Sequence, residues 1–247
     1  MMGLAQLLGA GILVLLPLCA TAAQPAARPD FSGIWLPDES RAAPWPAQLP
    51  LTPAARTFVE KFDPAADDPV SFCMPFGTPR NMLQTQYPLQ ILQTAQRVVM
   101  VLQPDLANAE VRRIPVDGSA LPKDTEASWF GTSRGRWDGA TLVVETIGLR
   151  ADSLLSGVGL PHSDKLRVVE RLSLVEDPRR GRVLVDDIEL HDSDAYTAPL
   201  RTRRYFVAAP LANLVEGSCV ERKWIDKLWR DRLQEHAAAA RGKAGAP

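Results

Sequence analysis

The stretch GTSRGRWDGATLVVET, residues Gly131–Thr146, has the pattern of a β-hairpin. Its dipeptide Asp138-Gly139 favours a tight turn, and the run that follows is rich in β-branched residues, which favour strands. Similar short runs of strand-forming residues recur on both sides of this hairpin, separated by turn-forming residues. The expected strands are residues 30–37, 89–94, 97–103, 110–117, 133–137, 141–148, 166–175, 182–190 and 201–208.

No segment long enough for a crossover helix separates the strands from residue 89 onward, so a parallel sheet is not expected. A long series of short antiparallel strands closes most economically into a barrel or a sandwich. We therefore predict a mainly β protein, an antiparallel meander closed into a lipocalin-like barrel. An irregular proline-rich segment precedes most of the strands, and a C-terminal helix follows them. Within that segment a short helix is expected at residues 51–62, where Thr52 can cap and Pro53 can begin the first turn.

The first residues predict export. Residues 3–19 are almost wholly apolar, and the small residues Ala20–Ala23 follow them, as at a signal-peptide cleavage site. An uncleaved anchor and a lipoprotein are the alternatives, although large residues precede Cys19 and make a poor lipid-attachment motif. The protein is then expected to be periplasmic or secreted, with no membrane attachment after cleavage. The predicted organisation is a signal peptide at residues 1–23, one barrel domain at 24–235 and a disordered tail at 236–247.

Composition excludes several classes of function. The 247 residues are 46% hydrophobic, enough for a sizeable core, and the net charge of -1 argues against an electrostatic nucleic-acid interface. After cleavage two cysteines remain, Cys73 and Cys219, and an even pair in an oxidising compartment indicates one disulfide. Two separate buried thiols are the alternative. The chain contains no paired-cysteine, HExxH or phosphate-loop motif, so we expect no metal and no cofactor.

Two acidic residues fall in apolar rows of the expected strands. Glu170 alternates with leucine and valine at residues 166–174, and Asp186 does the same at residues 184–190, so both acids should face the barrel interior. A buried carboxylate is costly unless it is paired. Glu170 should therefore pair with an arginine, or else line a cavity that holds water or a ligand. The arginines considered as partners are Arg112, Arg113 and Arg134.

The hairpin also carries two arginines that a plain turn does not require. If residues 138–139 form a two-residue turn, Gly135 lies opposite Leu142. Arg134 and Arg136 then lie on the other face of the strand from the small residues and Trp137. The open question is whether Arg134 meets Glu170 or a substrate.

Histidine is scarce, and His162 lies in the loop GVGLPHSDKL before the strand of Glu170. A loop at a barrel mouth is where a general acid or base is expected, and an exposed histidine bonded to Ser163 or Asp164 is the alternative. The predicted catalytic residues are His162 to move a proton, Glu170 to orient it, and Arg134 to stabilise an oxyanion, a role that Arg113 could share. The predicted ligand-binding residues are Arg113, Trp129, Ser133, Trp137 and Tyr196.

Several fragments together resemble a family of exported bacterial proteins: DFSGIW, DDPVSFCMPFGTPRNM, RRIPVDG, SWFGTSRGRWDGATLVVET, GLPHSDKLRVVERL, DAYTAPL and CVERKW. The motif GxSRGRWDGxTLVVxT is the most specific part of this resemblance. It implies a single-domain secreted protein and pairs Cys73 with Cys219, but it implies no reaction. His191 and Leu200 depart from the family pattern. Separately, the start Gly33-Ile34-Trp35 resembles the GxW start of lipocalin-type barrels.

These observations favour an exported small-molecule enzyme without a cofactor. Its chemistry would be of the acid–base kind, as in a lyase, hydratase or isomerase, on a largely apolar substrate in a β-barrel cavity. The alternative is a non-catalytic periplasmic binding protein for a hydrophobic small molecule, and a third possibility is a structural protein with a filled barrel. The sequence leaves the oligomeric state and the substrate open.

Overall fold

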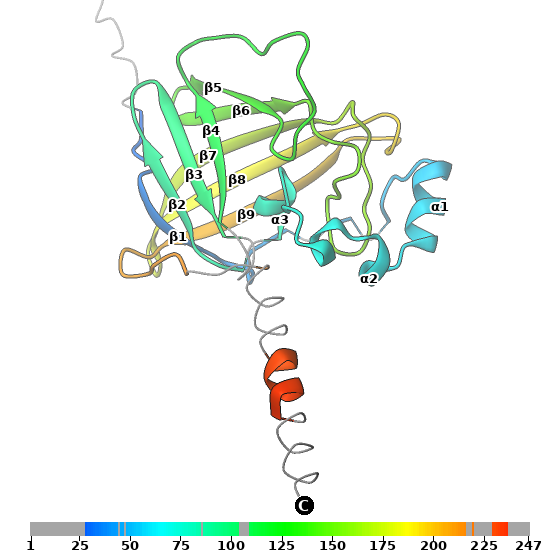
Figure 1. Ribbon diagram of the computed structural model, residues 1–247. Helices are drawn as coiled ribbons and strands as arrows, with labels where there is room; N and C mark the ends of the chain where they lie inside the picture. Colours follow the sequence, from blue (N-terminus) through cyan, green and yellow to red (C-terminus); the bar gives the residue numbers. More distant parts are fainter. Residues whose placement is uncertain are drawn as a thin grey trace, which may run out of the picture.

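The computed structural model describes residues 28–43, 45–46, 48–84, 86–103, 109–215, 219 and 229–236. Nine antiparallel strands form one sheet, which curls into a nearly closed barrel (Figure 1). This confirms the predicted mainly β meander. The strands are β1 (Gly33–Pro37), β2 (Leu89–Gln93), β3 (Arg97–Leu102), β4 (Glu110–Pro115), β5 (Thr132–Asp138), β6 (Thr141–Ile147), β7 (Arg167–Asp177), β8 (Gly181–His191) and β9 (Leu200–Ala208).

Apart from β4 and β5, strands that follow one another in the chain are neighbours in the sheet, whose order is β4-β3-β2-β1-β9-β8-β7-β6-β5. The last strand, β9, pairs with the first, β1, and this pairing closes the barrel on one side. The sheet ends at β4 and β5, and no backbone ladder joins these two described strands. The barrel is therefore open at a single seam, between the two strands that the long connection of residues 116–131 links.

The β5–β6 hairpin has a different register from the predicted one. Asp138 pairs with Thr141, so the two turn residues are Gly139 and Ala140, and Gly135 lies opposite Val144. The turn is shifted because Gly139, with φ +59°, supplies the left-handed conformation at its first position. Since the shift is by two residues, each side chain keeps the face that was predicted for it.

Four short helices lie between β1 and β2. They are α1 (Pro53–Lys61), α2 (Pro64–Asp67), the 3-10 helix η1 (Pro69–Phe72) and α3 (Arg80–Leu83). Thr52 caps α1 through a hydrogen bond from the Ala55 N–H, and Pro53 follows it, as predicted. Figure 1 shows α1 and α2 beside the barrel, whereas α3 lies close to the strands. All four residues of α3 are buried.

Cys73 and Cys219 form the predicted disulfide, with 5.6 Å between their Cα atoms. It ties the end of η1 to the C-terminal region, in which residues 229–236 are helical. Among the described residues no helix has the length and apolar character needed to cross a membrane. The predicted signal peptide lies outside the described residues, as does the predicted tail apart from His236.

Candidate functional site

The interior of the barrel contains an ion pair between β4 and β7. Arg112 Nη1 and Nη2 donate to the two carboxylate oxygens of Glu170, at 2.8 and 2.6 Å, and both side chains are almost completely buried. The same guanidinium lies 3.5 Å from Thr146 Oγ1, which is hydrogen-bonded to Ser133 Oγ at 2.8 Å. Glu170 thus faces inward as predicted, and of the two alternatives for it the structure shows the ion pair, with Arg112 as the partner among the three candidates.

Asp186 on β8 is a second interior acid, and it has no salt-bridge partner within the part of the chain that the structure describes. The residue is 0% exposed, and both carboxylate oxygens lack a hydrogen-bond partner among the described residues. Burial raises the pKa of Asp186 well above its ordinary value, the Glu170 carboxylate raises it further, and Arg112 opposes both. Burial in the barrel therefore favours the neutral form of Asp186, next to the salt bridge between Arg112 and Glu170.

One end of the barrel is covered by the segment at residues 74–84. Glu110 of β4 accepts hydrogen bonds from the Phe76 and Gly77 N–H groups and from Asn81 Nδ2. At the end of α3, the Leu83 carbonyl accepts a hydrogen bond of 3.0 Å from Arg204 of β9. Large apolar side chains are fully buried in the core, among them Phe31, Trp35, Met82, Met100 and Phe206. The interior is thus packed around the charged groups, and it serves as a scaffold.

His162 is held outside this scaffold, in the connection between β6 and β7. The side chain is 5% exposed. Its Nδ1 lies 2.8 Å from the Ser163 carbonyl oxygen, and its Nε2 lies 2.8 Å from Ser153 Oγ. Because a carbonyl oxygen only accepts, Nδ1 carries the proton and Nε2 presents its lone pair to Ser153. The structure therefore differs from the exposed histidine considered above, although Ser163 is one of the partners named for it.

Ser153 can stabilise the protonated form of the His162 imidazole. Its Oγ also lies 2.8 Å from the Arg150 carbonyl oxygen, so a single hydroxyl proton has two acceptors. If Nε2 were protonated, it would donate to Ser153 Oγ, and the hydroxyl would donate to Arg150, which satisfies all of these contacts. Burial opposes the charge and lowers the pKa of His162, while Ser163, Asp192 and Asp152 act in the other direction. At neutral pH the imidazole is therefore a neutral base in a site with hydrogen bonds for its protonated form.

The connection between β8 and β9 fixes the position of His162. The Asp192 carboxylate accepts from the backbone N–H and the hydroxyl of Ser163, at 2.5 and 2.9 Å. The Tyr196 hydroxyl donates to the Pro161 carbonyl at 2.8 Å, and burial raises the pKa of that hydroxyl. Residues on both sides of His162 are thus anchored to one loop, so the orientation of the ring is set by long-range contacts.

A cavity of about 820 Å³ lies where α1 and α2 face the β6–β7 connection, and His162 is part of its wall. Its apolar surface comes from Phe58, Phe62, Leu154, Pro161 and three alanines. Its charged groups are Lys61, Asp67 and Asp152, and Asp152 is already paired with Arg150. Apolar walls with a few polar groups are typical of sites for small molecules.

The three predicted catalytic residues do not meet. His162 borders the helix-lined cavity, Glu170 is paired with Arg112 inside the barrel, and Arg134 lies on the outer face of β5, bonded to the Ser133 carbonyl. The expectation that these side chains share one cavity is therefore wrong. It fails because successive residues of a strand point to opposite faces, so Arg134 and the interior carboxylate lie on different sides of the sheet.

The predicted ligand-binding residues are also dispersed. Arg113 is exposed on β4, with its side chain on the opposite face from Arg112. Trp129 lies under the Arg150 guanidinium at 4.9 Å, and Trp137 stacks on Phe31 at 5.5 Å. Only Tyr196 supports the His162 site, and it does so through the loop backbone. Ser133 lies inside the barrel, bonded to Thr146.

Two important residues, Ser153 and Asp192, were not predicted for the site. Both are buried polar residues, at 2% and 5% exposure. Their sequence neighbourhoods, RADSLL and LHDSDAYT, read as ordinary turns. The one usable signal was the resemblance fragment DAYTAPL, which begins two residues after Asp192.

Comparisons with protein-family models, with curated proteins and with solved structures found no match to this chain. The structure itself defines the class: a mainly β protein with a nearly closed antiparallel barrel and a helix-lined cavity beside it.

Proposed function

We propose that the protein is an exported small-molecule enzyme that performs acid–base chemistry on a largely apolar substrate. The proposed site is the helix-lined cavity rather than the interior of the barrel. Export is supported by the apolar N-terminal sequence and by the disulfide, a bond typical of oxidising compartments. The reaction would need no cofactor, because a general base can move a proton by itself.

The shape and the chemistry of the cavity favour a small, mostly apolar substrate. The two phenylalanines of the α1 region and Leu154 offer apolar surface, which stabilises a bound molecule by removing its own apolar surface from water. Lys61 lies at the rim and has no acidic partner among the described residues, so it can pair with an anionic group of the substrate. A lyase, a hydratase and an isomerase all act on molecules of this kind.

The Ser153–His162 pair is the observation that carries the proposal. A neutral, oriented imidazole at the wall of a cavity can take a proton from a substrate carbon or from water. The proton would reach Nε2 directly or through the Ser153 hydroxyl, and it would return to the substrate in a later step. General-base catalysis of this kind contributes roughly 10²–10⁴-fold to a rate.

A non-catalytic carrier is the second candidate, and one observation favours it. Both ring nitrogens of His162 already have partners within the protein. A ring with both nitrogens hydrogen-bonded inside the protein can have a purely structural role, in which it holds Ser153 and Ser163 in place beside a binding cavity.

Ligand analysis separates the two candidates. The full chain would be purified after export, and any bound molecule would be extracted and analysed by liquid chromatography and mass spectrometry. His162→Gln should retain a compound different from the one in the wild type, because conversion is blocked. His191→Gln, which alters a part-exposed histidine on β8, should match the wild type. The same compound in all three proteins would identify a carrier, and no compound in any of them would contradict both candidates.

A further inference from the structure

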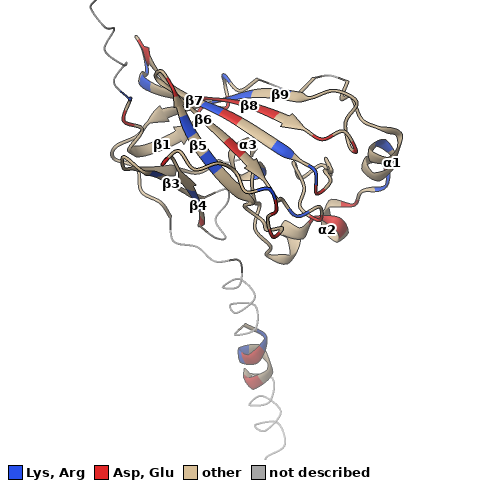
Figure 2. Cartoon of the chain, turned by 90° about the horizontal axis from the view of Figure 1, so that it is seen from above, with Lys and Arg blue, Asp and Glu red and all other residues tan. Residues whose placement is uncertain are grey.

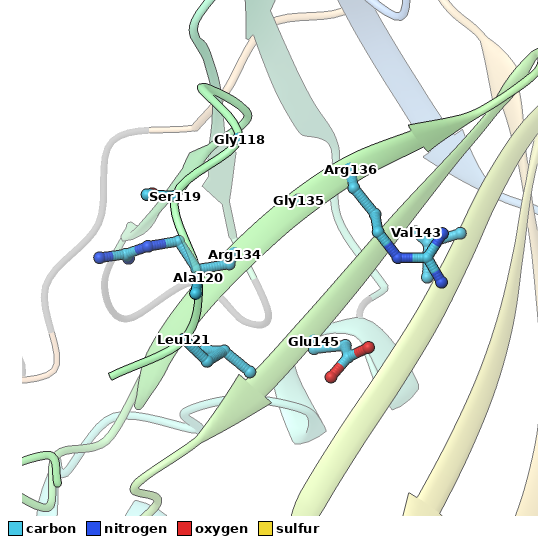
Figure 3. Close-up of a pocket in the computed structure, with 9 residues that line it drawn as sticks. All are labelled: Gly118, Ser119, Ala120, Leu121, Arg134, Gly135, Arg136, Val143 and Glu145. Carbon is cyan, nitrogen blue, oxygen red and sulfur yellow. The ribbon is translucent and has the colours of Figure 1, made fainter. Parts of the chain in front are cut away.

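A second cleft, of about 280 Å³, lies on the outer face of the β5–β6 hairpin (Figure 3). Residues 118–121, from the connection between β4 and β5, form one wall, and the outward side chains of β5 and β6 form the other. Its lining includes Arg134 and Arg136, the two arginines that a plain β-hairpin does not require. The cleft shares no residue with the helix-lined cavity, so it is independent of the proposed function.

The hairpin places Arg134 and Arg136 on the same outer face, opposite Glu145 and Val143 in the register. Figure 3 shows Arg134 running toward the wall at Ala120, while Arg136 extends in the other direction, toward Val143. Arg134 Nη1 donates a hydrogen bond to the Ser133 carbonyl, and its buried Nε has no partner among the residues that the structure describes. Arg136 is exposed and has no hydrogen bond or ion pair with any described residue.

Two acids near the cleft, Glu145 and Asp117, are already engaged, and Asp138, two residues beyond Arg136 on β5, does not line the cleft. Glu145 accepts a hydrogen bond from Arg167 of β7 at 2.7 Å. Asp117 accepts from the N–H and the hydroxyl of Ser119 through one oxygen. On the neighbouring strands acidic and basic residues alternate side by side (Figure 2), and they form pairs such as Arg203–Asp187. In contrast to those pairs, the cleft has a surplus of positive charge.

The rest of the lining is small or apolar. Val143 is buried at 1% exposure, and Leu121 and Ala120 complete the wall. Gly135 packs against the end of β4, because an added Cβ would lie 2.7 Å from Val116 Cγ1. Thus Gly135 has a packing role inside the barrel, whereas the arginines on either side of it point outward and have no such role.

We infer that this cleft binds a small molecule that has one carboxylate group and a short apolar body. The carboxylate pairs with the Arg136 guanidinium, whose donors match its two oxygens, and Arg134 adds positive potential. The apolar body lies against Leu121 and Ala120 of the opposite wall. A free guanidinium beside an apolar wall is the arrangement that such a ligand requires.

Octanoate is a suitable probe, with octanol and acetate as its uncharged and short-chain analogues. In heteronuclear NMR titrations of the full chain, octanoate should shift the amide signals of residues 118–121 and of Val143 in a saturable manner. Octanol and acetate should each bind more weakly. Arg136→Gln should weaken octanoate binding about fivefold or more, since it removes the charge-assisted hydrogen bonds. The matched control is Arg97→Gln on β3, which removes an exposed arginine that has no ion pair with a described residue and should leave the affinity unchanged.

Three results would overturn the inference. Octanol binding as tightly as octanoate would show an apolar contact without an anion site. Equal losses in Arg136→Gln and Arg97→Gln would show a general effect of net charge. The absence of saturable shifts in these amides, with the folded spectrum intact, would show that the cleft takes no such molecule.

Discussion

Asp186 should make the stability of the barrel depend on pH, and replacing it with asparagine should remove that dependence. Asparagine has nearly the shape of the protonated aspartic acid but does not titrate. In the folded protein the pKa of Asp186 is raised by burial and by Glu170, whereas in the unfolded chain it is ordinary. The folded state therefore holds a proton that the unfolded state loses as the pH rises.

The sign of the effect follows from this difference. The stabilising contribution is complete below the unfolded pKa, and it is lost as the pH rises toward the folded pKa. Each pH unit within that window removes about 1.4 kcal/mol from the free energy of unfolding. Asp186→Asn should therefore be close to the wild type at the acidic end and increasingly more stable than it toward neutral pH.

Urea denaturation followed by tryptophan fluorescence, at half-unit steps from acidic to neutral pH, measures this difference. The control is Asp187→Asn, which alters the next residue on β8; its side chain pairs with Arg203 at the surface. The control should differ from the wild type by at most about 1 kcal/mol, as is usual for surface pairs. A constant or shrinking advantage of Asp186→Asn with rising pH would refute the reasoning.

Three other substitutions test the scaffold. Glu170→Gln should lower the free energy of unfolding by about 3–5 kcal/mol, because Arg112 is left buried without its partner. The control Glu145→Gln, at a surface pair, should cost at most about 1 kcal/mol in the same urea titration. Equal losses in the two variants would show that burial does not strengthen the Arg112–Glu170 pair. Replacing both Cys73 and Cys219 with serine should lower the free energy of unfolding by up to about 5 kcal/mol, because the disulfide closes a loop with a sequence separation of 146 residues. An unchanged urea denaturation midpoint would show that the disulfide does not stabilise the protein. Gly135→Ala should cost about 1–3 kcal/mol by overpacking against Val116, seen as a lower melting temperature, and an unchanged melting temperature would mean that the seam near β4 can relax.

The sequence predicted the barrel well because its information is local. Alternation with period two was enough to place the strands and to turn Glu170 and Asp186 inward. The choice of Arg112 over Arg113 was open in the sequence because β4 and β7 are not neighbours in the sheet, and only the closure of the barrel brings them together. The predicted register of the β5–β6 hairpin was wrong for a local reason, because an Asp-Gly dipeptide does not determine which two residues occupy the turn.

The candidate site was harder to predict because it is assembled from distant segments. The burial of His162 depends on Asp192 and Tyr196, which lie about thirty residues further along the chain, and on Ser153 in an irregular turn. The cavity wall comes from α1 and α2, in a proline-rich region with no pattern that predicts a binding surface. Periodicity describes the faces of strands but carries no information on how loops pack.

Two neighbouring alanines of α2 test directly whether a small molecule occupies the helix-lined cavity. Both are exposed, but Ala66 lines the cavity and Ala65 does not. Native mass spectrometry of the exported protein should detect a small-molecule adduct in the wild type and in Ala65→Trp, and the adduct should be lost in Ala66→Trp, where the indole fills the space. An adduct that persists equally in both variants would place the ligand elsewhere and contradict the claim.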